Sequence, residues 1–184
     1  MKTIYLIPFG AADEEIFASV ELSLWHSFGW EVRRLPALEE PGFAFEPQRR
    51  QYSSVLILRM LQSVFPADAL RLLGVTEGDL FIPMLSFVFG QAQLNGGLAL
   101  ISLARLRQTF YGLAENNAVT AARAVKEATH EIGHTFGLTH CLDAGCPMSL
   151  SNTIWQVDRK REELCPKCAF LLQEMPAWKS QSRP

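Results

Sequence analysis

The sequence predicts a single domain of the α/β (or α+β) class, in which a mixed sheet packs on helices. The chain opens with an apolar run at residues 3–9 that is typical of a buried strand, an amphipathic run at 13–28 and a second predicted strand at 30–35. This strand–helix–strand order is typical of a mixed sheet. The chain has 184 residues, of which 48% are hydrophobic and 20% are charged. These values favour one globular domain with a sizeable core.

Local signals give the elements of the N-terminal half. Asp13 is a candidate N-cap for the helix at 13–28, and Gly29 ends that helix. The proline-rich segment that follows the second strand is expected to be a loop. The expected elements from this point are a loop at 36–47, a helix at 52–64, a short helical turn at 68–73 and a strand at 79–85.

The C-terminal half contains the strongest helix prediction, residues 117–136, because this run is rich in alanine and ends at Gly137. Before it, three glycines between 87 and 97 indicate irregular strands, and Asn95-Gly96-Gly97 indicates a hairpin turn. The remaining expected elements are a strand at 98–103, a solvated helix face of mixed charge at 158–163 and a frayed tail at 179–184.

Composition argues against several classes of protein. No run of about 18 uncharged apolar residues exists, so no transmembrane helix is expected. The first apolar run stops at Pro8 and is too short for a signal peptide. The net charge is -2 and there is no basic stripe, which disfavours nucleic acid as a partner. We therefore expect a cytoplasmic monomer that binds neither membranes nor nucleic acid.

The residues suited to chemistry are concentrated in one part of the chain. Three of the four histidines and all four cysteines lie between residues 130 and 168. Scattered structural use does not give such a distribution, so the functional site is expected there.

The histidines form an HExxH motif on the predicted helix 117–136. His130 and His134 are one turn apart, so both imidazoles project from the same face and can hold one Zn²⁺. Glu131 follows the first ligand, where its carboxylate can act as general base toward a water whose pKa zinc lowers to about 7. A buried helix can also place two histidines at this spacing merely to satisfy polar groups.

The motif continues as far as His140, which argues against that structural interpretation. Gly137 can end the helix with a positive φ, so that the chain turns back and brings His140 to the metal. Three histidines with one open position are typical of a catalytic zinc. This extended motif resembles that of the metzincin proteases, in which a methionine turn follows. Met148 is the methionine near enough to supply it.

The cysteines form two close pairs, Cys141 with Cys146 and Cys165 with Cys168. Four thiols in this arrangement favour a structural zinc site, and two disulfides are the alternative. The absence of secretion signals favours zinc. A redox CxxC lacks the βαβ context it needs, and the acidic balance disfavours a nucleic-acid-binding zinc ribbon.

The joint pattern resembles the archaemetzincins, a family of metzincin-type metallopeptidases. The run from His130 to Cys141 carries the resemblance, together with Cys146-Pro147-Met148 and Cys165-Pro166-Lys167-Cys168. The resemblance implies that His130, His134 and His140 bind a catalytic zinc, that Glu131 is the general base and that Met148 lies beneath the metal. It also implies a second, structural zinc, and hence two Zn²⁺ per chain, with the second held by Cys141, Cys146, Cys165 and Cys168.

The resemblance further implies a twisted mixed sheet over long helices, with the zinc helix at the floor of a cleft. An antiparallel edge strand, expected within residues 87–103, would border this cleft and hold an extended peptide. We expect residues 1–184 to form one metzincin-like catalytic domain, of which 141–178 is a zinc-clamped C-terminal subdomain. Because the first strand begins almost at Met1, no latency-conferring pro-segment is expected.

Two functional hypotheses follow. The leading one is a zinc metallopeptidase that hydrolyses peptides or small proteins, with aminopeptidase action in some members of the family it resembles. The other is a non-catalytic, zinc-stabilised module that binds a peptide or a protein. Glu131 discriminates between them, because a binding module has no need of a base next to the first ligand.

Overall fold

The computed structural model describes residues 2–179, without the side chains of Ala177 and Lys179. Of the tail expected at 179–184, residues 180–184 lie outside the described part. Within that part, no helix is long and apolar enough to cross a membrane.

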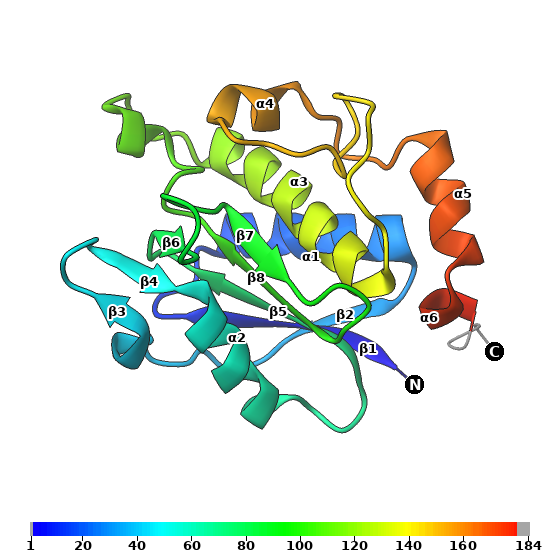
Figure 1. The fold of residues 1–184 in the computed structure, drawn as a ribbon, viewed down its shortest axis with the longest axis horizontal. Helices are drawn as coiled ribbons and strands as arrows, with labels where there is room; N and C mark the ends of the chain where they lie inside the picture. Colours follow the sequence, from blue (N-terminus) through cyan, green and yellow to red (C-terminus); the bar gives the residue numbers. More distant parts are fainter. Residues whose placement is uncertain (1, 180–184) are drawn as a thin grey trace.

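A five-stranded sheet forms the centre of the molecule (Figure 1). Its strands in spatial order are β2 (Glu31–Arg34), β1 (Thr3–Phe9), β5 (Ala69–Thr76), β8 (Leu98–Ser102) and β7 (Gly90–Ala92). The first four are parallel to one another, and β7 runs antiparallel to β8 at the edge. The mixed sheet expected from the sequence is confirmed, as is an antiparallel edge strand within 87–103.

Helices cover both faces of this sheet, as the strands' alternating side chains require. On one face, Ile4 and Leu6 pack with residues of α1 (Glu14–Phe28) and α3 (Asn117–Phe136). On the other face, Tyr5 and Ile7 pack with residues of α2 (Ser54–Leu61). The described part of the chain thus has two hydrophobic clusters, one on each side of the sheet.

The expectation of a helical turn at 68–73 is wrong, because these residues belong to β5. The run Ala69-Leu70-Arg71-Leu72-Leu73 is rich in good helix formers, so local propensity points away from a strand. The segment lies between β1 and β8 and pairs with both. Hydrogen bonds to two distant strands therefore override the local preference.

Smaller differences concern the segment before and after α2. A second, three-stranded sheet consists of β3 (Phe45–Glu46), β4 (Gln51–Ser53) and β6 (Leu80–Phe81). The strand expected at 79–85 is therefore much shorter, since only Leu80 and Phe81 belong to it. The loop expected at 36–47 ends in the strand β3. That loop also holds the 3-10 turn η1 (Gly42–Ala44). The expected helix 52–64 consists of α2 and the 3-10 turn η2 (Gln62–Val64).

Both ends of α3 are capped, and the C-terminal cap is the glycine expected from the sequence. Asn116 is the N-cap, and its side chain accepts a hydrogen bond from the backbone N–H of Val119. Gly137 is the C-cap, with φ of 104°, and its N–H donates to the carbonyl of His134 over 2.9 Å. The helix therefore ends where the sequence predicts, and it is buried along most of its length.

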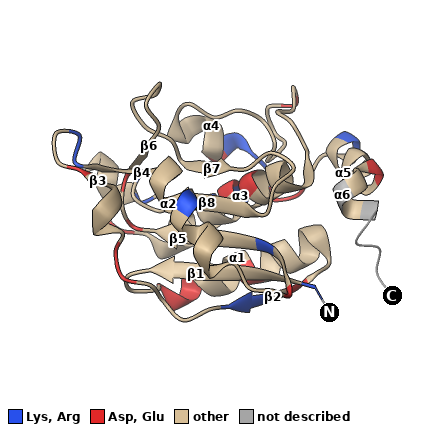
Figure 2. Ribbon diagram, turned by 60° about the horizontal axis from the view of Figure 1, so that its bottom comes forward, with Lys and Arg blue, Asp and Glu red and all other residues tan. Residues whose placement is uncertain are grey.

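After α3, the chain forms a long loop and then α4 (Ile154–Arg159), α5 (Pro166–Glu174) and α6 (Pro176–Lys179). The expectation of a solvated helix face at 158–163 is wrong in part. Helix α4 ends at Arg159, and Lys160 is 3% exposed. Asp158 accepts two hydrogen bonds from Arg123 on α3, at 2.6 and 2.8 Å. Acidic and basic residues are otherwise interspersed over the molecule (Figure 2).

Candidate metal centre and active-site cleft

The three histidines of the extended motif come together at the C-terminal end of α3. His130 and His134 project from the helix, and His140 lies on the extended segment after Gly137. One ring nitrogen from each lies within 4.8 Å of the others. The Nε2 atoms of His130 and His134 are 3.0 Å apart. Two ligands of a tetrahedral zinc lie about 3.3 Å from each other, so the cluster has the dimensions of a zinc site.

Backbone carbonyls orient the two helical imidazoles. Nδ1 of His130 lies 2.8 Å from the carbonyl oxygen of Pro147, and Nδ1 of His134 lies 2.7 Å from that of Leu138. A carbonyl can only accept a hydrogen bond, so each Nδ1 carries the proton and each Nε2 keeps a free electron pair. Burial lowers the pKa of His130, and nearby Lys160 lowers it further, which favours the neutral form that binds metal.

Met148 lies against α3, at the position expected for a methionine turn. Its side chain is fully buried. A Cβ atom at Gly133 would lie 2.5 Å from Sδ of Met148 and 3.1 Å from its Cε, so only glycine leaves room for this approach. Nothing in the sequence alone indicates that Met148 is the partner of Gly133. The local signal for such a close approach is the presence of a glycine inside a strongly predicted helix.

Glu131 lies at the floor of the cleft, beneath the edge strand. Its residue exposure is 5%, and burial raises the pKa of its carboxyl group, as does the neighbouring carboxylate of Glu127. A Cβ atom at Gly90 on β7 would lie 2.6 Å from Oε1 of Glu131. The edge strand can therefore pass directly over the carboxylate because it carries glycine there. The role of Gly90 was not foreseen from the sequence.

A buried ion pair next to the cleft was also missed. Nζ of Lys160 lies 3.1 Å from Oε1 of Glu127, one helical turn before Glu131, and the two side chains are 0% and 4% exposed. The positive charge of Lys160 opposes the rise in the pKa of Glu131 that burial causes. The pair also joins the segment after α4 to the catalytic face of α3. The charged run 158–163 gave no sign of it, because partner choice across 33 residues is a tertiary property.

The histidines and Glu131 open into a cleft of about 370 Å³. Its lining includes the segment that leads into and includes β7, with Phe87 and Phe89, and the residues Leu150, Ser151 and Asn152 of the loop after α3. Such a volume can hold a few residues of a peptide.

The four cysteines form a second cluster, separate from that of the histidines. Their sulfur atoms all lie within 4.8 Å of one another, and all four thiols are free. The Sγ atoms of Cys141 and Cys165 are 3.8 Å apart. Two thiolates on a tetrahedral zinc are separated by about 3.8 Å, whereas a disulfide requires about 2.0 Å. The cluster therefore fits zinc and does not fit a Cys141–Cys165 disulfide.

Hydrogen bonds favour the thiolate form at one of these ligands. Cys165 is the N-cap of α5, and its Sγ accepts a hydrogen bond from the N–H of Cys168 over 3.4 Å. Burial opposes ionisation of Cys165, but this bond and those from the neighbouring thiols lower the pKa of Cys165 overall. A metal-binding thiol is deprotonated, so this environment suits a ligand.

The two clusters share a stretch of backbone. His140 belongs to the first cluster and Cys141, the next residue, to the second. The N–H of Cys141 donates to the carbonyl of Met148 over 2.9 Å. The structure thus brings together every site residue expected from the sequence, and it joins the methionine turn to both clusters.

Comparison with known proteins agrees with this geometry. The model of the family "Peptidase family M54" matches residues 45–174. The archaemetzincin of Methanocaldococcus jannaschii is 44% identical over 171 residues, which cover 93% of each chain. The crystal structure of the archaemetzincin from Methanopyrus kandleri matches with a TM-score of 0.84 and 36% identity, over 94% of each chain. A zinc-dependent peptidase from Methanocorpusculum labreanum matches with a TM-score of 0.85 and 33% identity, over 92% of this chain and 99% of that one.

The buried pair predicts a stability effect that is specific to Lys160. In Lys160→Met, the carboxylate of Glu127 stays buried without a partner, so we expect the free energy of unfolding to fall by about 3–5 kcal/mol. The double variant Lys160→Met/Glu127→Leu should recover most of this loss, because it removes the unpaired charge. Urea unfolding of the metal-loaded protein measures both.

The matched control is Arg159→Met, since Arg159 is exposed and adjacent to Lys160. It should change the free energy of unfolding by no more than about 0.5 kcal/mol. Equal losses in the single and the double variant would contradict the argument, because the effect would then not arise from an unpaired carboxylate.

Proposed function

The chain belongs to peptidase family M54, the archaemetzincins, and we propose that it is a zinc-dependent metallopeptidase whose catalytic zinc is bound by His130, His134 and His140. The observation that carries the proposal is the convergence of three imidazoles beside one buried carboxylate, that of Glu131. The donor set and its spacing fit zinc, as argued above. The expected substrate is a peptide or a small protein.

When bound, zinc supplies a Lewis acid that polarises the scissile carbonyl group and lowers the pKa of water to about 7. Glu131 accepts a proton from the attacking water and delivers it to the leaving amine. Its raised pKa makes it a stronger base than an ordinary carboxylate. A non-catalytic binding module would have no use for a buried base at this position.

The substrate is held by the edge strand. β7 is the last strand of the sheet, and β8 pairs with it on one side. An extended peptide can add to the other side through backbone hydrogen bonds. Because Gly90 lies directly over Glu131, a peptide bound along β7 would pass close to the base.

We further propose that Cys141, Cys146, Cys165 and Cys168 bind a structural zinc that acts as a clamp. This site would fix the backbone from which His140 projects, and it would tie the turn at Met148 to the C-terminal helices. In this view residues 1–184 form one catalytic domain, with 141–178 as its zinc-clamped segment. Structural zinc also contributes directly to the free energy of folding.

Metal content is the first test. Purified protein should contain two zinc ions per chain by elemental analysis, because the two clusters share no ligand. A chelator should remove the zinc of the three-histidine site first, because that site keeps an exchangeable position. One zinc ion together with oxidised cysteines would contradict the structural zinc site.

Exchange of the base is the second test. Glu131→Gln keeps the size of the side chain and the zinc ligands, so zinc content should stay at the wild-type value. Hydrolysis of a mixed peptide library should slow by at least about 10²–10⁴-fold, which is the usual contribution of acid–base assistance. The control is Glu39→Gln, because Glu39 is exposed and lies outside the cleft. Hydrolysis at the wild-type rate in Glu131→Gln would refute the assignment of the base.

The clamp makes a prediction about a residue that touches no catalytic ligand. Cys165→Ser should weaken zinc binding at the three-histidine site as well as lower Tm, since supporting groups hold metal ligands to within about 0.5 Å of their working geometry. Zinc affinity of the histidine site, measured in folded Cys165→Ser protein, is the deciding quantity. If that affinity equals the wild-type value, the cysteine site only anchors the C-terminal segment.

A further inference from the structure

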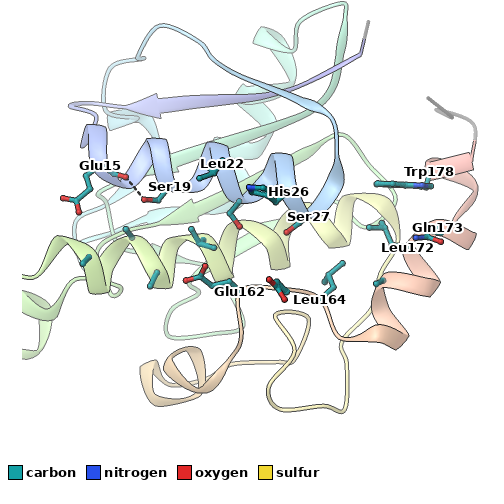
Figure 3. Close-up of a pocket in the computed structure, with 17 residues that line it drawn as sticks. Glu15, Ser19, Leu22, His26, Ser27, Glu162, Leu164, Leu172, Gln173 and Trp178 are labelled. Atoms are coloured by element: carbon teal, nitrogen blue, oxygen red, sulfur yellow. Dashed lines mark hydrogen bonds between the residues drawn. The ribbon is translucent and has the colours of Figure 1, made fainter. Parts of the chain in front are cut away.

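A second cavity, larger than the active-site cleft, lies on the other side of α3. It has a volume of about 810 Å³ and runs between α1, α3 and the C-terminal segment (Figure 3). We call it the rear groove. Its lining residues on α3 include Ala118, Ala122 and Val125. At about 100° per residue, these point to the side of the helix opposite Glu127 and Glu131. The rear groove is therefore separate from the catalytic cleft.

Small side chains on both helices make this groove hollow. Helix α1 contributes Ser19, Ser23 and Ser27, and α3 contributes only alanines and one valine. Larger apolar residues form the walls: Leu22, Leu164, Leu172 and Trp178. In Figure 3, Leu22 lies on α1 while Leu164, Leu172 and Trp178 come from the C-terminal segment. Leu22 is 58% exposed although it borders other apolar side chains. The groove thus presents an apolar floor to solvent.

The residues that line the groove include no lysine or arginine, so their charge is of one sign. Its charged residues are Glu15, Glu162 and Glu163. Within residues 2–179, Glu15 and Glu163 form no ion pair. Glu162 is attracted by the charge of Lys126. The Nζ atom of Lys126 donates a hydrogen bond to the carbonyl of Asp158 over 3.1 Å. Carboxylates at the rim of an apolar groove attract cations that belong to a partner with an apolar face. They repel nucleic acid and anionic membranes.

We propose that the rear groove is a docking site for a basic amphipathic helix of a partner protein. The lining residues of α1 extend from Glu15 to Ser27, a length of about 18 Å at 1.5 Å per residue. A helix of about three turns has that length. Its apolar face would pack on α1 and α3 as a third helix, and its lysines or arginines would reach the carboxylates at the rim. This proposal is independent of the peptidase activity.

The probe is a fluorescein-labelled, amidated peptide of about 15 residues, with leucines at i, i+3, i+4 and i+7 and lysines at the remaining positions. The reference peptide carries the same leucines with glutamates in place of the lysines. Zinc-loaded Glu131→Gln protein is used, so that neither peptide is hydrolysed. We expect saturable binding of the lysine peptide, with an affinity that falls as salt rises, and at least about tenfold weaker binding of the glutamate peptide.

Two pairs of variants locate the binding. Glu15→Lys/Glu163→Lys should weaken binding of the lysine peptide about tenfold or more, and Glu39→Lys/Glu46→Lys, with the same net charge, should change it less than about threefold. Ala122→Trp fills the floor and should abolish binding. The matched control is Ala18→Trp, because Ala18 is exposed on α1 outside the groove. Backbone amide signals should shift at Ser19, His26 and Ala122, and stay unchanged at Gly90 and His140.

Several outcomes would overturn the proposal. These are absence of saturable binding, equal binding of the two peptides, insensitivity to Ala122→Trp, or amide shifts confined to the catalytic cleft. Sedimentation tests a different occupant. A dimer of the wild-type protein that Ala122→Trp converts to a monomer would mean that a second copy of this chain fills the groove.

Discussion

At Gly137 the backbone adopts a φ of 104°, a conformation that residues with a Cβ atom rarely adopt. This ends α3 and turns the chain back toward the helix it has just left. His140 can then meet His130 and His134, and Cys141 can meet the other three cysteines. The N–H of Leu138 donates to the carbonyl of Gly133 over 3.1 Å, and the carbonyl of Leu138 in turn orients His134. A single helix end therefore determines the positions of ligands in both clusters.

The second constraint is that polar groups on α3 are buried and need partners. Carbonyl oxygens of the following loop satisfy Nδ1 of His130 and His134, and Lys160 satisfies Glu127. These contacts all join α3 to the segment beyond residue 137. The same groups that are costly to bury thus fix the C-terminal segment to the catalytic helix. Close contact with Met148 explains why residue 133 must be glycine, and close contact with Glu131 explains why residue 90 on β7 must be glycine.

Helix α3 borders the catalytic cleft on one face and the rear groove on the other. One face holds the histidines and Glu131, with the glycine-bearing edge strand over them. The opposite face carries alanines, and together with the serines of α1 it leaves a groove edged by glutamates. The groove is hollow because small residues stand where larger ones would complete the packing of α1 on α3. The groove and the cleft differ in chemistry, because the histidines line the cleft whereas three glutamates and no lysine or arginine line the groove.

The sequence by itself determined the features that depend on local spacing. Helix α3 and its caps follow from residues within one or two turns of each other, as do the histidine motif and the cysteine pairs. The edge strand beside the cleft was expected only as a region, within 87–103. Tertiary structure alone decided that residues 69–76 are a strand, because two distant strands pair with them. It also decided that Lys160 is buried against Glu127, that Gly133 leaves room for Met148 and that Gly90 leaves room for Glu131. Such contacts join residues far apart in the chain, so no local pattern encodes them.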